Sequence, residues 1–157
     1  NTIFLSSLLL NSETWLNLDK ADIDELESID RILFKSFFKS PKSTTNVSLY
    51  LETGCIPIRY IIMKRRILFL HEMLNLDKNE MLSKVFWTMA DDPLKNDWIV
   101  TVKKNLLELG IDNNLESIRV KKKAKFKKEI RLAIEKRAFE YLKEEIEKKD
   151  LFIFCRD

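Results

Sequence analysis

The sequence predicts an all-α fold, an array of about five to seven helices, on three observations. The chain has only two glycines and three prolines in 157 residues, which favours long helices with short connections. Apolar residues recur at three- and four-residue spacing, and no segment reads convincingly as a strand. Hydrophobic residues make up 45% and charged residues 34%, so the chain can bury a core and keep a polar surface.

The first half of the array is predicted as follows. Residues 2–16 form an apolar helix or extended segment ending near Trp15. Asp19 caps an amphipathic helix over residues 20–39, whose apolar positions are Ile23, Leu26, Ile29, Leu33 and Phe37. Pro41 ends that helix, because the residue before a proline avoids the α conformation. After a polar loop over 42–45, a short helix over 46–53 ends at Gly54.

A central helix is predicted over residues 57–75, where Pro57 suits a first helical turn. Apolar residues cover most of its circumference, from Ile58 to Leu74, so the helix should be buried on several sides.

Three more helices complete the array. The first covers about 78–90, opens with Asp77 and Glu80 as a capping box, and packs Met81, Leu82, Val85, Phe86 and Met89. The second carries Trp98, Val102, Leu106 and Leu109 and ends at Gly110. The third covers about 119–149, and its apolar stripe comprises Phe126, Ile130, Ala133, Ile134, Ala138, Tyr141, Leu142 and Ile146.

Positive charge concentrates at the C-terminal end. Residues 119–157 hold 14 basic and 8 acidic side chains, whereas residues 1–58 hold 5 and 8. The basic run consists of Lys121, Lys122, Lys123, Lys125, Lys127 and Lys128. Lysines at this density suit phosphate contacts that do not depend on base sequence. A nuclear localisation signal and a merely solvated helix face are the alternatives.

Four cations lie on the predicted central helix. Arg59 and Arg66 are seven residues apart and so share one side of it. They either grip nucleic-acid phosphates or pair with carboxylates such as Glu52 or Glu72 to fix helix packing. Lys64 and Arg65 point elsewhere and are better exposed contacts.

Several function classes find no support in the sequence. Asp91-Asp92 sits at a predicted helix end before Pro93, without the strands that surround a polymerase metal site. The single histidine, His71, excludes a zinc-protease motif and leaves no convincing catalytic triad. Cys55 and Cys155 follow no metal-ligand spacing, so no cofactor or metal is expected. The simplest interpretation of the two cysteines is a reduced protein inside the cell, either nuclear or cytoplasmic. No apolar run reaches the roughly 20 residues of a membrane helix.

The order of several short motifs carries a family resemblance. Leu51-Glu-Thr-Gly54, Pro57-Ile-Arg-Tyr-Ile-Ile62 and Arg65-Arg66 resemble the segment beyond the polymerase core in reverse transcriptases of non-LTR retrotransposons, especially those with a restriction-like endonuclease. Further similar stretches are Asn11–Trp15, Asp22–Asp30, Lys95–Lys104, Leu106–Gly110 and Lys136–Leu142. The resemblance covers about residues 8–147. The palm aspartates and the zinc knuckle of that family are missing from this chain.

The resemblance implies a thumb and linker that hold RNA or an RNA/DNA hybrid beside a separate polymerase core. It divides the chain into a thumb-like segment (1–56), a central linker (57–118) and a basic C-terminal helix with its tail (119–157). Because the chain starts at Asn1 and lacks the catalytic core, we expect a non-catalytic piece of a longer protein. The rival interpretations are a helical protein-interaction module, favoured if Trp87, Trp98 or Phe37 lies on an exposed apolar patch, and a relic without function.

Overall fold

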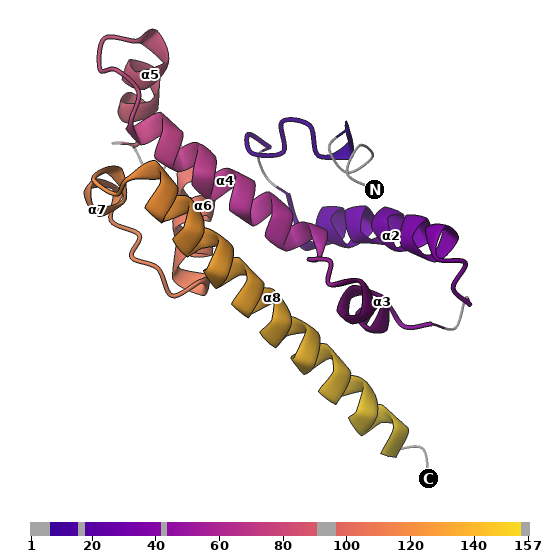
Figure 1. Ribbon diagram of the computed structural model, residues 1–157. Coiled ribbons are helices and arrows are strands. Elements are labelled where there is room, and N and C mark those ends of the chain that lie inside the picture. Colours follow the sequence, from indigo (N-terminus) through magenta and orange to yellow (C-terminus); the bar gives the residue numbers. More distant parts are fainter. Residues whose placement is uncertain (1–6, 16–17, 42–43, 91–96, 155–157) are drawn as a thin grey trace. The chain divides into compact units, whose positions relative to one another are not determined.

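The computed structural model describes residues 7–15, 18–41, 44–90 and 97–154, and helices connected by turns make up most of those ranges (Figure 1). Its helices are α2 (Lys20–Phe37), α3 (Asn46–Thr53), α4 (Ile58–Leu74), α5 (Met81–Ala90), α6 (Asp97–Glu108), α7 (Leu115–Arg119) and α8 (Lys123–Phe154). No strand occurs within the described ranges. The predicted all-α array is therefore confirmed.

The chain forms two compact units. The first comprises residues 1–18 and 62–133, and the second comprises residues 19–61 and 134–157. Two helices, α4 and α8, each contribute residues to both units. The sequence-based division into segments 1–56, 57–118 and 119–157 rests on motif pattern and charge, and it stays a prediction.

The second unit contains α2, α3, the first turn of α4 and the larger part of α8. Its core consists of Phe34, Val47, Leu49, Tyr50 and Leu142, with Cys55, Tyr141 and Ile146 packed against it. The Tyr50 hydroxyl donates a hydrogen bond of 2.9 Å to the buried carboxylate of Asp30. Burial raises the pKa of Asp30 above its usual value of 3.8, because the charged form loses water.

The first unit contains the rest of α4, all of α5 to α7 and the start of α8. Side chains from each of these elements are fully enclosed, among them Leu70, Leu106, Ile118 and Phe126. The N-terminal segment joins this unit through Trp98, whose indole N–H donates to the Glu13 carbonyl at 2.7 Å. Residues 7–14 form a helical turn and further turns, in place of the predicted long apolar element.

Helix ends follow the predicted chemistry closely. Asp19 and Asp22 form a reciprocal capping box at the start of α2. Gly54 and Gly110 have φ angles of 64° and 68° after α3 and α6, as predicted. After α2, Lys39 takes the same left-handed position with a φ of 49°, so the helix ends at Phe37, two residues before the predicted end.

The central helix α4 matches its predicted range to within one residue at each end, and its only residue classed as exposed is Glu72. The predicted face of α5 was wrong in part. Met81, Leu82 and Val85 are 81%, 56% and 45% exposed, and only Phe86 of the described predicted positions is buried. The Asp77 carboxylate accepts from Asn79 in a turn instead of capping a helix, so α5 begins at Met81.

The last predicted helix begins later than expected. Asn114 caps the separate short helix α7 by accepting from the backbone of Glu116 and Ser117. The chain then turns at residues 120–122, and α8 starts at Lys123. The rest of the predicted stripe from Phe126 to Ile146 is buried or half-buried, as expected. The Asp91-Asp92-Pro93 break, part of the 42–45 loop and the last residues of the tail lie outside the described ranges.

Candidate nucleic-acid interface

The basic run is fixed in place by contacts behind it. The ring of the buried His71, from α4, stacks on Phe126 at 4.8 Å between ring centroids. Its Nε2 atom lies 2.9 Å from the Lys121 carbonyl, which can only accept, so Nε2 carries the proton. These contacts hold the turn before α8 and the first turn of that helix against α4, within the first unit.

Two lysines of the run are tied to carboxylates. The Lys121 ammonium lies 2.9 Å from Glu129 and 5.7 Å from the centre of the Phe126 ring. The Lys123 ammonium lies 2.9 Å from Glu72 of α4. Both pairs are partly or largely exposed, so each contributes little to stability, but each reduces the positive charge available to a partner.

The other four lysines of the run are exposed, and no described residue forms an ion pair with them: Lys122, Lys125, Lys127 and Lys128. We call these four the free lysines. Lys125 and Lys128 are three residues apart on α8, so their side chains are neighbours on one helix face. The buried Phe126 and Ile130 lie toward the opposite face. Lys127 lies two residues from Lys125 and so projects from a different side of α8, and Lys122 precedes the helix. The free lysines therefore place positive charge around the start of α8.

Arg131 extends this surface and was missed in the sequence. It is exposed and lies three residues after Lys128, in line with Lys125 and Lys128. The sequence signal for Arg131 is the three-residue spacing of basic residues from Lys122 onward.

Two of the predicted arginines serve the interior of the first unit. The Arg65 guanidinium donates to the Leu9 carbonyl and lies 3.4 Å from the Ser12 hydroxyl. Arg66 is 6% exposed and donates to the Trp15 carbonyl at 2.5 Å, while its Nε has no partner among the described residues. Burial lowers the pKa of Arg66. Both arginines hold the N-terminal segment, so Lys64, half-buried and without a described ion-pair partner, is the more available cation of α4.

Arg59 forms a core pair in the second unit. Its Nε and Nη2 donate to the two carboxylate oxygens of Glu27 at 2.6 and 2.8 Å, and its guanidinium lies 4.8 Å from the centre of the Tyr141 ring. The hydrogen bonds to Glu27 raise the pKa of Arg59. Of the two alternatives, this geometry favours packing over phosphate binding. The partner was predicted wrongly, because Glu27 and Asp24 take the place of Glu52 and Glu72.

The described part of the chain offers neither a metal site nor a membrane-spanning helix. No three histidine, cysteine, aspartate or glutamate side chains there come close enough to hold a metal ion. None of the described helices is both long and apolar enough to cross a membrane.

Comparison of the chain with protein-family models, with curated proteins and with solved structures finds no match.

Proposed function

We propose that this chain is a non-catalytic thumb and linker region that binds the sugar-phosphate backbone of RNA or of an RNA/DNA hybrid. The observation that carries the proposal is the surface of free lysines on the turn before α8 and its first turns. Four unpaired ammonium groups within seven residues attract a polyanion, and lysine contacts phosphate without reading bases.

The contacts of the arginines support a structural role for them and a binding role for the lysines. Arg59, Arg65 and Arg66 are occupied by protein groups, so they stiffen the scaffold. The free lysines, with Lys64 as a further cation, remain for the nucleic acid. Lys121 and Lys123 can join only if a phosphate competes with Glu129 and Glu72.

The binding test uses a fluorescent RNA/DNA hybrid and fluorescence anisotropy. Replacing the four free lysines by glutamine is expected to weaken binding strongly, because the contacts are electrostatic. Replacing Lys121 and Lys123, which already have carboxylate partners, is expected to weaken it less. An equal loss of affinity in both variants, or no loss in either, would contradict the role proposed for the free lysines.

The parent protein is proposed on the family resemblance alone: a non-LTR retrotransposon reverse transcriptase whose polymerase core would be the second partner. The test is to read the transcript upstream of Asn1. An in-frame core with a Tyr/Phe-x-Asp-Asp motif is expected, and an unrelated reading frame there would contradict the assignment. Nuclear import through the lysine run remains compatible with this proposal.

A protein-interaction module is the second candidate, favoured by an exposed aromatic pair on the second unit. Phe37 and Phe38 are 69% and 48% exposed and contact each other edge to face at 5.1 Å. Ile32 on α2 is also 65% exposed. Large exposed apolar groups mark partner surfaces. Trp98 is buried and does not support this function, and a relic would bind neither partner.

A further inference from the structure

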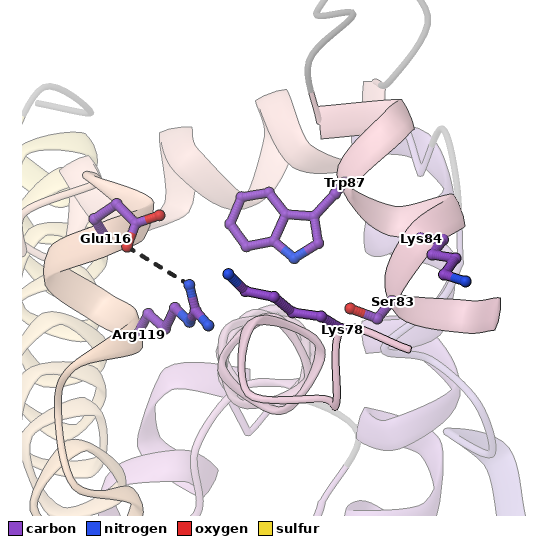
Figure 2. Close-up of a pocket in the computed structure, with 6 residues that line it drawn as sticks. All are labelled: Lys78, Ser83, Lys84, Trp87, Glu116 and Arg119. Atoms are coloured by element: carbon purple, nitrogen blue, oxygen red, sulfur yellow. Dashed lines mark ion pairs between the residues drawn. The ribbon is translucent and has the colours of Figure 1, made fainter. Parts of the chain in front are cut away.

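A second positively charged site lies in the first unit and shares no residue with the basic run. Residues of α5, of α7 and of the turn before α5 line a pocket of about 350 Å³, within the size range of small-molecule sites. Its lining combines three cations, one carboxylate, one indole and one hydroxyl: Lys78, Lys84, Arg119, Glu116, Trp87 and Ser83. Figure 2 shows the six side chains.

Two like charges converge in this pocket. The ends of the Lys78 and Arg119 side chains point toward each other beneath the indole ring, whereas Lys84 directs its ammonium away (Figure 2). Glu116 approaches Arg119 only at 3.9 Å and is 69% exposed, so it compensates little of their charge. Two cations held close together favour an anion between them.

A buried hydroxyl without a partner also faces the pocket. Ser83 is fully buried, and its Oγ has no hydrogen-bond partner in the described part of the chain. The hydroxyl points toward the interior of the pocket (Figure 2). A buried polar group left unpaired is costly, so a ligand with a polar atom at this depth would gain a hydrogen bond that the free protein lacks.

The indole supplies a flat surface above the cations. Trp87 is half-buried, and its ring is held by an edge-to-face contact with Phe86 at 5.6 Å. A planar base can stack on an indole, and this interaction tolerates any base. A bare phosphate would use only the cations, so the indole and the hydroxyl indicate a ligand with an aromatic ring as well as a charge.

We propose that this pocket binds a nucleotide. The base stacks on Trp87, Lys78 and Arg119 hold the phosphate, and the Ser83 hydroxyl bonds to a polar atom of the base or sugar. The ligand is either a free nucleotide or one unit of a single strand. The pocket shares no residue with the free lysines, so this proposal stands or falls separately from backbone binding.

The test is an NMR titration of the whole chain with adenosine 5′-monophosphate, ribose 5-phosphate and inorganic phosphate. The reporter is the Trp87 indole N–H signal, assigned by its absence in Trp87→Phe. We expect the nucleotide to shift this signal and to bind about tenfold more tightly than either base-free anion, because base stacking contributes about that factor. Equal affinity for all three would reduce the site to an anion site and overturn the proposal.

Variants divide the contributions. Lys78→Gln and Arg119→Gln are each expected to weaken nucleotide binding about tenfold, since each removes a charge-assisted hydrogen bond. Ser83→Ala should weaken it severalfold without lowering stability, because its hydroxyl is unpaired in the free protein. Lys104→Gln, on the exposed face of α6, is the matched control and should bind normally. Normal binding in the Lys78 and Arg119 variants would contradict the assignment.

The source of the nucleotide follows from a titration with hexa-adenylate. Tighter binding of the hexamer than of the monophosphate identifies a unit of a single strand, and exclusion of the hexamer identifies a free nucleotide. Either result supports a nucleotide site, whereas failure of both ligands to shift the Trp87 signal overturns it. Lys125→Gln and Lys128→Gln should leave the monophosphate titration unchanged, so failure of this site is distinguishable from failure of backbone binding.

Discussion

Replacing Arg59 by methionine tests whether this arginine stabilises the fold or binds nucleic acid. The substitution leaves Glu27, whose side chain is only 9% exposed, without its two hydrogen-bond donors. Removing one partner of a buried pair costs about 3–5 kcal/mol. Because the Arg59 side chain is 26% exposed, solvent screening reduces this cost, and we expect a loss of about 2 kcal/mol in the free energy of unfolding.

The assay is urea unfolding followed by far-UV circular dichroism. The double variant Glu27→Leu/Arg59→Met removes both charges, so it should be more stable than Arg59→Met alone, which leaves one charge buried. Lys148→Gln breaks an exposed pair with Glu145 and serves as the control, with little expected change. An unchanged urea midpoint in Arg59→Met, together with weaker binding of nucleic acid, would refute the packing role.

Three further changes have definite expected outcomes. Burial raises the pKa of Asp30, so the folded state holds this proton more tightly than the unfolded state. The free energy of unfolding should therefore fall as pH rises from 3.8 through the folded pKa. Asp30→Asn should flatten that fall in urea titrations at several pH values. Tyr50→Phe removes the hydroxyl that donates to the Asp30 carboxylate and should cost about 1–3 kcal/mol by the same assay. Gly110→Ala should cost about 1 kcal/mol in thermal unfolding through backbone strain alone, because a Cβ there meets no atom within 4 Å. A stabilised Gly110→Ala, a neutral Tyr50→Phe or an unaltered pH profile in Asp30→Asn would each contradict its mechanism.

The elements that local chemistry decides were predictable from the sequence. Capping at Asp19 and left-handed glycines at Gly54 and Gly110 depend on residues within one turn, so the start of α2 and the ends of α3 and α6 follow directly. The apolar residues around most of the circumference of α4 likewise predicted burial on several sides. These features need no knowledge of which segments meet in space.

Features decided by distant partners were not predictable. The apolar positions of α2 predict a buried stripe that includes Phe37, yet Glu27 and Asp30 are buried and Phe37 is exposed. The reason is that Arg59 and Tyr50, 32 and 20 residues away, supply donors to these two carboxylates. A periodicity argument treats every carboxylate as a surface group, so it cannot find a buried one that has a partner.

The candidate sites also combine features that the sequence predicts with features that depend on distant partners. The density of lysines predicted a basic surface, but which of them pair depends on Glu72 and Glu129. The nucleotide pocket joins Lys78 and Trp87 to Arg119, residues of separate elements with no shared motif, so sequence spacing offered no signal for it.

The salt dependence of binding to an RNA/DNA hybrid tests the central claim most directly. The slope of log affinity against log salt should become shallower by about 3 when the four free lysines become glutamine, at about 0.7–0.9 per phosphate contact. The matched control replaces four exposed lysines elsewhere, namely Lys20, Lys39, Lys104 and Lys143. The account predicts that the control keeps the original slope. Equal slopes for the wild type and the free-lysine variant would contradict it.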